Sequence, residues 1–365
     1  MKSTRSISLL LASTAFLSMA NAAFALDGND VLAKFNALTA PNGVSFTAAS
    51  TAVDGTTVTL SGVTLTAKDA KKPVPLGDVT LEGVTEEEGG YEIEKASFAD
   101  LNVLENGSGV SAKDIYIEGI SLPAKPEPGT LESVMIASSF HVGETKITAE
   151  NKQVVTIGEI AGSYELSDDE NTVEAETAVT GIKIDTTSAP DPKAQEAIQA
   201  LGLQTIAGDI TMKGSWTLDS GKMDITEYSF DFADIGRLDL NFSLSGYTLE
   251  LVKSMQEAMK AAEANPDKAA GQQALGMSMM GLMQQLIYNS SSIRFDDAGI
   301  TTKVLDYAGK QQGVDGKQFA QSLKGMLPML LAQMNMPDLQ NQIVTAANAY
   351  LDDPKSIEVS SEPAQ

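Results

Sequence analysis

The stretch 209–246 restricts the fold of this chain most strongly, because its apolar residues recur at every second position. Along 237–245 the even-numbered side chains are apolar and the odd-numbered ones are polar, which is the pattern of a strand with one buried face. A tight turn at 219–222 separates two earlier strands. The stretch therefore predicts an antiparallel meander. Its last strand is expected to bury Leu238, Leu240, Phe242 and Leu244.

An internal repeat before the meander predicts that the sheet is curved. The apolar residues change parity at a central glycine in the segments 58–65, 79–84, 115–122 and 179–184. A β-bulge at the glycine inserts one residue, bends the strand and returns the apolar side chains to one face. The meander changes face in the same way at 226–227, where we expect a further bulge.

The apolar period changes from 2 to 3.6 after residue 248, which is typical of helices. The expected elements are helices at about 249–265, 267–288, 315–333 and 338–351, a hairpin joining 293–295 to 300–307, and an edge strand at 357–359. Two short helices are expected earlier, one ending at Pro41 and one between Pro192 and Gly202. The predicted fold class is α+β, with a large curved antiparallel β-sheet, a bulged meander, packed against the C-terminal helices.

The first 25 residues have the features of a secretory signal peptide. A basic start is followed by an apolar run at 7–20 and by small residues at Ala23 and Ala25, where we expect cleavage. The predicted organisation is thus a signal peptide at 1–25, a β-rich region with short helices at 26–247, and a mainly helical region with one hairpin at 248–365. No later segment is apolar for 18 residues, so we expect no transmembrane segment after cleavage and a periplasmic location.

The charge balance and the absence of cysteine exclude several functions. The formal net charge is −24, and loss of Lys2 and Arg5 with the signal peptide makes it −26. Such an acidic chain repels nucleic acid, which we therefore exclude as a partner. With no cysteine there is no disulfide, no thiolate nucleophile and no Cys-ligated metal.

The sequence shows no catalytic signature. His141 is the single histidine, which argues against a zinc site or a Ser-His-Asp arrangement, and we interpret it as an ordinary surface or hydrogen-bonded residue. Phosphate-binding loops, dinucleotide fingerprints and nucleophile elbows are missing. We therefore predict no enzyme activity, no cofactor and no metal, while a hydrolase built on two distant carboxylates stays open as an alternative.

Methionine is concentrated near the C-terminus, where 10 of the 13 methionines of the mature chain follow residue 250. Three interpretations stay open. The thioethers fill an irregular helix–sheet core, or the cluster at 277–280 ligates copper(I), or the flexible side chains line a groove for an apolar ligand. The residues predicted to line such a groove are Met279, Met280, Met283, Phe319, Leu323 and Met326.

Three segments carry a resemblance to uncharacterised exported proteins of Gram-negative bacteria: LGLQTIAGDI at 201–210, GRLDLNFSLSG at 236–246 and YLDDPKSIEVSSEP at 350–363. In its long strands with a repeated β pattern the chain also resembles AsmA-like envelope proteins, which are associated with lipid handling. The methionine-rich apolar helices lead to the expectation of a non-enzymatic periplasmic binding protein that holds a lipid or another apolar envelope component. The alternative is a structural or adaptor protein that binds another envelope protein.

Overall fold

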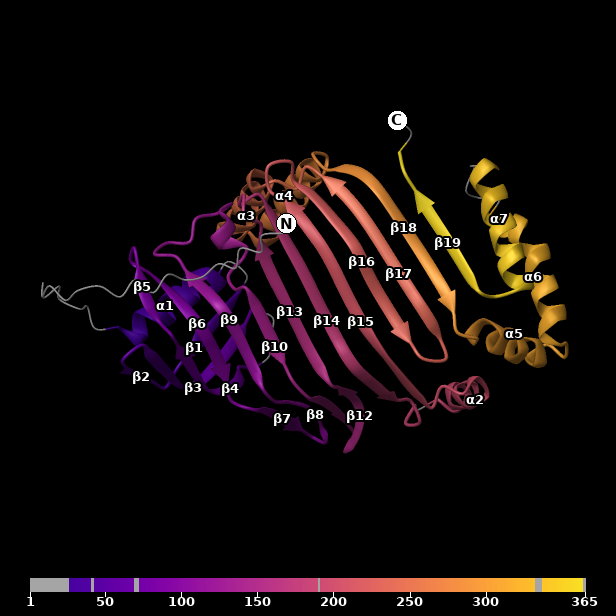
Figure 1. Cartoon of the computed structure of the whole chain (residues 1–365), viewed down its shortest axis with the longest axis horizontal. Coiled ribbons are helices and arrows are strands. Elements are labelled where there is room, and N and C mark those ends of the chain that lie inside the picture. The colour runs from indigo at the N-terminus through magenta and orange to yellow at the C-terminus, as the bar shows by residue number, and fades with distance from the viewer. Residues whose placement is uncertain (1–25, 41–42, 69–71, 190, 332–336, 364–365) are drawn as a thin grey trace, which may run out of the picture.

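The computed structural model describes residues 26–40, 43–68, 72–189, 191–331 and 337–363. Within these residues the chain forms nineteen β-strands and seven α-helices, and all the strands belong to one antiparallel sheet. The sheet is open, and several of the helices follow it at the C-terminal end (Figure 1). The predicted α+β class with a large antiparallel sheet is confirmed.

The strands follow one another closely along the chain. The first ten are β1 (Val44–Thr47), β2 (Ser50–Asp54), β3 (Thr57–Ala67), β4 (Val74–Glu82), β5 (Thr85–Glu87), β6 (Gly90–Phe98), β7 (Leu101–Glu105), β8 (Ser108–Ala112), β9 (Ile115–Leu122) and β10 (Ser139–Val142). The other nine are β11 (Thr145–Ala149), β12 (Lys152–Ile157), β13 (Glu159–Leu166), β14 (Thr172–Asp185), β15 (Thr205–Thr217), β16 (Lys222–Phe232), β17 (Gly236–Ser245), β18 (Ile287–Asp297) and β19 (Ser356–Ser361).

Strand pairing gives the sheet one long order and one branch. The long order runs β3–β4–β6–β9–β10–β13–β14–β15–β16–β17–β18–β19, with β1 and β2 both paired to the outer side of β3. The branch β7–β8–β11–β12 joins the sheet at β14. The predicted meander is therefore β15–β16–β17, and β19 is the expected edge strand.

Local sequence signals explain most of the helix ends. The helices are α1 (Gly28–Thr39), α2 (Pro192–Leu201), α3 (Leu249–Ala264), α4 (Lys268–Met283), α5 (Ile300–Gln311), α6 (Gly316–Leu331) and α7 (Pro337–Asp352). The side chains of Asp27, Asp191, Thr248 and Asp267 accept hydrogen bonds from backbone N–H groups at the starts of α1 to α4. The helix expected between Pro192 and Gly202 is confirmed, with the glycine in the left-handed conformation as its C-cap.

The hairpin expected at 293–307 is wrong, because only its first arm is a strand. That arm lies within β18, and the second arm is helix α5. The Asp297 carboxylate accepts hydrogen bonds from the backbone N–H groups of Gly299 and Thr301, which starts a helix instead of a hairpin turn. Helix α4 also ends at Met283: of the residues expected to continue it to Tyr288, 284–286 form a turn and only the last two open β18.

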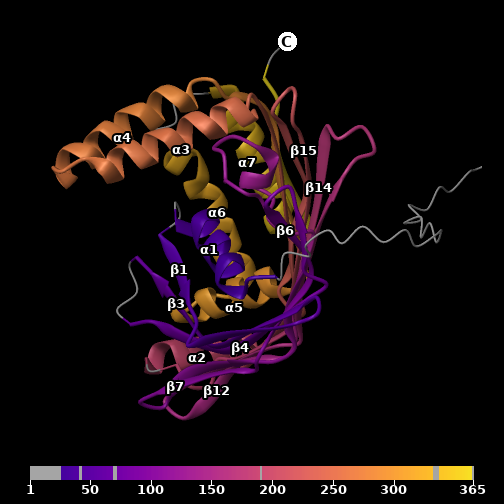
Figure 2. The same cartoon turned by 90° about the vertical axis from the view of Figure 1, so that its left-hand side faces the viewer.

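Three of the predicted bulges are present as register shifts, whereas Gly83 lies just beyond the end of β4 and the β6–β9 register runs past Gly119 without a shift. The strand register shifts between Leu60 and Val63 and between Val179 and Ile182, in both cases around a glycine with positive φ. The register also shifts between Ile225 and Ser229, where the meander was expected to change face. Seen from its N-terminal end, the sheet forms a trough with α1 inside it (Figure 2).

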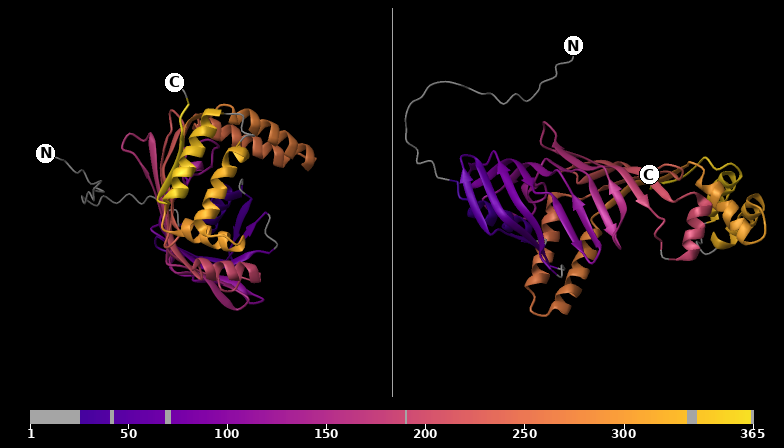
Figure 3. Two further views of the ribbon diagram at one scale, coloured as in Figure 1. Left: turned by 90° about the vertical axis from the view of Figure 1, so that its right-hand side faces the viewer. Right: turned by 90° about the horizontal axis from the view of Figure 1, so that it is seen from below.

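The most completely buried part of the molecule lies between α1 and the first strands. Its cluster joins Val31 and Leu38 of α1 to buried residues of β3, β4, β6 and β9. Helices α3 and α4 form a hairpin that projects over the open side of the trough, while α5, α6 and α7 gather beyond β18 (Figures 2 and 3). The N-terminal helix, and not the methionine-rich helices, thus covers the tightest part of the core.

Among the described residues, the helices are all too short or too polar to cross a bilayer. The signal peptide expected at 1–25 lies outside the described residues.

Candidate functional site

An apolar cavity of about 370 Å³ lies between α1 and the concave face of the sheet. Leu32, Phe35 and Leu38 come from one face of α1, because residues three and four apart on a helix point the same way. The sheet side includes Phe46, Leu60, Val63, Val79, Leu81, Ala96, Phe98, Ile117, Ile120 and Phe140. The lining of this first cavity contains no charged residue, so it offers a ligand hydrocarbon contacts and few hydrogen bonds.

Two glycines of the repeat, both with positive φ, aim neighbouring residues of opposite parity into this first cavity. Leu60 and Val63 flank Gly62 on β3, and Ile117 and Ile120 flank Gly119 on β9; all four line the cavity. In a regular strand two residues three apart would point to opposite faces. The repeat recognised in the sequence is therefore the device that builds the apolar concave face.

A second cavity of about 360 Å³ continues the first along the sheet. Its floor comes from β14, β15 and β16, and includes Val173, Ala175, Met212, Trp216, Met223 and Ile225. The two cavities share three lining residues: Ile136, Ala137 and Tyr164. Two of these belong to residues 131–137, here called the strap, which begins with the 3-10 helix η2 (Leu131–Ser133) and leads towards β10. The strap therefore divides one apolar groove into two compartments.

The apolar face continues beyond the second cavity to the end of the sheet. Ile225 in the second cavity pairs with Phe242 on β17, and Leu240 pairs with Ile293 on β18, which in turn pairs with Val359 on β19. Directly paired residues share a face. The side chains of Phe242, Ile293 and Val359 are exposed by 38%, 54% and 49%. The meander thus has the predicted apolar face, but none of its four residues expected to be buried is so: Leu238, Leu240 and Leu244 are half-buried and Phe242 is exposed. This end of the groove is therefore open.

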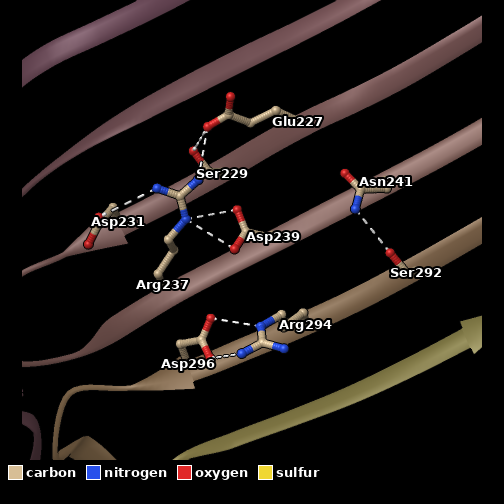
Figure 4. A network of polar contacts seen from close by, with 9 residues as sticks. All are labelled: Glu227, Ser229, Asp231, Arg237, Asp239, Asn241, Ser292, Arg294 and Asp296. Atoms are coloured by element: carbon tan, nitrogen blue, oxygen red, sulfur yellow. Dashed lines mark hydrogen bonds and ion pairs between the residues drawn. The ribbon is translucent and has the colours of Figure 1, made fainter.

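The outer, convex face carries charges instead. Arg237 on β17 contacts carboxylates of Glu227 at 2.8 Å, Asp239 at 2.9 Å and Asp231 at 3.8 Å (Figure 4). Partial burial by itself lowers the pKa of Arg237, but the hydrogen bonds to Glu227 and Asp239 raise it overall. On β18, Arg294 pairs with Asp296 at 2.6 Å and with Glu358 of β19 at 3.5 Å. The sheet therefore separates an apolar inner face from a charged outer one.

His141 lies on β10 next to Phe140, whose side chain lines the first cavity, so alternation puts the histidine on the outer face. Its ring stacks on Tyr116 at 4.7 Å between centroids. Its two nitrogens lie 3.3 Å from a carboxylate oxygen of Asp114 and 3.2 Å from one of Glu159. Within the described residues, no group of three or more histidine, aspartate or glutamate side chains is arranged to hold a metal ion.

The six residues predicted to line a ligand groove lie on two helices. Met279, Met280 and Met283 belong to α4, and Phe319, Leu323 and Met326 belong to α6. The linings of the two apolar cavities do not include them. On α4 the side chains of Met277, Met280 and Met283 are exposed by 71%, 69% and 57%, so this methionine face does not fill the core.

Sequence reasoning missed the cavity residues from the N-terminal half. The signal that points to them is the glycine repeat, since the residues flanking Gly62 and Gly119 meet in the first cavity. The repeat indicated curvature, but not that the concave side would hold empty space. The short helix expected before Pro41 is α1, whose N-cap is Asp27.

Comparison with known proteins gives no functional name. A family model described as "Uncharacterized protein" matches residues 229–365. The matched region holds β17, β18, β19 and helices α3 to α7, and it excludes all the residues that line the first cavity. No curated protein matches the chain.

Proposed function

We propose that this protein is a non-enzymatic periplasmic binding protein that holds the hydrocarbon part of a lipid, or of another apolar envelope component, on the concave face of its sheet. The observation that carries the proposal is the pair of adjoining apolar cavities, of about 370 and 360 Å³. Cavities of some hundreds of Å³ with apolar linings are typical of small-molecule sites.

Packing energetics favour an occupant. Atoms that line an empty apolar space lose dispersion contacts on one side, and water gains few hydrogen bonds there. The exposed apolar strip over β17, β18 and β19 leads from solvent to the second cavity, so a chain has a route along the sheet. A hydrocarbon chain would restore the lost contacts without leaving a polar group unpaired.

The proposal is tested by native mass spectrometry and by organic extraction of protein purified from its own periplasm. We expect a mass increase that disappears on extraction, with a lipid in the extract. A single ligand-free mass, together with no uptake of added lipid, would overturn the proposal.

A substitution that fills the groove with a larger side chain, compared with the same substitution outside the groove, tests whether the ligand lies there. Ala137→Phe adds a phenyl ring at the wall shared by the two cavities and should lower lipid occupancy at least tenfold, whereas Ala124→Phe on the exposed loop should leave it unchanged. Thermal unfolding checks that both variants are folded. Equal occupancy in the two folded variants would contradict a ligand in the groove.

A second function, an adaptor that binds another envelope protein, is favoured by the exposed methionine face of α4. The variant Met280→Glu plus Met283→Glu should stay folded because both side chains are exposed. An adaptor would lose a crosslinked partner in this variant, and the lipid content would not change. If the variant keeps every crosslinked partner, the adaptor hypothesis is contradicted.

A further inference from the structure

A third cavity, with polar residues in its lining, adjoins the apolar groove at the end of α1. It has a volume of about 450 Å³ and lies where the last turn of α1, the loop 126–133 and helix α3 meet. Its lining is Ala37, Leu38, Ala40, Pro126, Glu127, Pro128, Ser133, Gln256, Met259, Lys260 and Glu263. We call it the polar chamber. Unlike the first cavity, it brings charged side chains together beside apolar ones.

The polar chamber borders both apolar compartments. Leu38 lines the chamber and also the first cavity, so the end of α1 forms the wall between them. Ser133 of the strap lines the chamber, while the adjacent Val134 lines the second cavity. A molecule with a polar end in the chamber therefore has an apolar compartment next to it on two sides.

The side walls of the chamber are held in place by specific contacts. The Gly129 backbone N–H donates to the side-chain oxygen of Gln256 on α3 at 2.9 Å, which fastens the loop 126–133 to that helix. The Lys68 ammonium lies 2.5 Å from the Glu263 carboxylate and ties the far end of α3 to the end of β3. The hydrogen bond from Lys68 lowers the pKa of Glu263, so this carboxylate stays ionised at neutral pH.

The charges of the chamber have both signs. Its lining has one ammonium, from Lys260, and two carboxylates, from Glu127 and Glu263. The ion pair with Lys68 neutralises the charge of Glu263, which leaves Lys260 and Glu127 as a nearly balanced pair. A net anionic group would gain from Lys260 but meet Glu127 and the field of a chain with net charge −24. A group with both a phosphate and an amine matches both signs.

We propose that the ligand of this groove is an amphiphile with a zwitterionic head group, whose phosphate and amine lie in the polar chamber beside Lys260 and Glu127 while its hydrocarbon enters the apolar compartments. The inference rests on the proposed function, because it assigns the head group of the same ligand. It also assigns a role in ligand recognition to α3, which supplies Met259 to the chamber and was not among the helices predicted to line a groove.

The test compares four lipids with identical acyl chains by native mass spectrometry of the full-length protein. They are phosphatidylethanolamine, phosphatidylglycerol, diacylglycerol and a monoglycosyl diacylglycerol. We expect phosphatidylethanolamine to bind at least tenfold more tightly than the other three. The variant Lys260→Gln should lower that affinity about tenfold and leave diacylglycerol binding unchanged, and Lys317→Gln on α6 should change neither.

The outcomes separate the two proposals. Equal affinity for all four lipids, or a preference for the anionic or the sugar head group, would overturn the zwitterionic assignment and leave the hydrocarbon groove intact. If Lys260→Gln binds phosphatidylethanolamine as tightly as the unmodified protein, the chamber does not hold the phosphate. Failure of all four lipids to bind would overturn the proposed function itself.

Discussion

Tyr91 links helix α1 to the sheet through a partly buried hydrogen bond. Its hydroxyl donates to the Asp30 carboxylate at 2.8 Å, and its side chain belongs to the core cluster. Burial, and then the contact with Asp30, raise the pKa of Tyr91 from 10.0 to about 12. In the folded protein the tyrosine thus keeps its proton at a pH at which the unfolded chain has lost it.

This difference predicts a loss of stability at high pH. Between pH 10 and about 12 the folded state binds more protons than the unfolded state, so the free energy of unfolding falls as the pH rises, by roughly 2 kcal/mol. Tyr91→Phe should cost about 1 kcal/mol at neutral pH and remove this part of the decline. Urea unfolding at pH 7, 10 and 11.5 measures both effects. A parallel decline in the two proteins would contradict the assignment.

At the scale of single residues, the alternation of apolar and polar residues predicted correctly which face of the sheet a side chain lies on. It predicted less well whether that side chain is buried. Leu238, Leu240 and Phe242 lie on the apolar face as expected, yet the two leucines are only half-buried and Phe242 is exposed. The methionines of α4 show the same limit. The spacing and type of apolar residues show which face of a helix or strand a side chain lies on. Whether another element buries that face depends on segments far away in the chain.

At the scale of elements, the bulged glycines are the features that shape the groove. Gly62 and Gly181 both have positive φ, and each backbone N–H donates to an aspartate of the neighbouring strand: to Asp78 at 2.8 Å and to Asp209 at 2.7 Å. The same arrangement thus occurs at two places along the sheet. The glycines were recognised in the sequence through the change of apolar parity, whereas the aspartates were not, since their partners lie 16 and 28 residues away.

Gly181→Ala should lower the free energy of unfolding by about 1–2 kcal/mol, because a Cβ atom disfavours the left-handed conformation. The added carbon would also lie 3.3 Å from two backbone atoms of Gly158, a tight contact that adds to the conformational cost. Gly276→Ala, in the exposed part of α4, is the control and should stabilise by up to about 1 kcal/mol. Equal effects in urea unfolding would contradict the strained bulge.

The hairpin expected at 293–307 shows why sequence pattern failed at one element. Ile300, Val304 and Tyr307 fit either a strand or a helical face. The Asp297 carboxylate favours the helix, because it accepts a hydrogen bond from the backbone N–H of Thr301 in the first turn of α5. Turn residues alone did not distinguish a hairpin turn from a helix start.

At the scale of the whole molecule, the sheet is a trough with hydrocarbon-like lining inside and charge outside. Period and repeat indicated the sheet, its curvature and its helical C-terminal part. The cavities could not be predicted in the same way, because they arise where α1 packs against a concave face that it does not fill. The candidate groove is therefore a property of assembled layers, and the part of the sequence that was expected to supply it, the methionine-rich helices, lies outside both apolar cavities.

Trp216 gives direct access to the central claim, because it is the single tryptophan of the chain and it lines the second apolar cavity. Bromine atoms on a lipid acyl chain quench tryptophan fluorescence only on close contact. We predict that lipid with brominated acyl chains quenches Trp216 on binding, that the unbrominated lipid of equal affinity does not, and that Ala175→Phe, which fills the same cavity, reduces the quenching. Lipid that binds, by native mass spectrometry, while the brominated and unbrominated forms leave equal Trp216 emission would contradict a hydrocarbon-binding groove on the concave face.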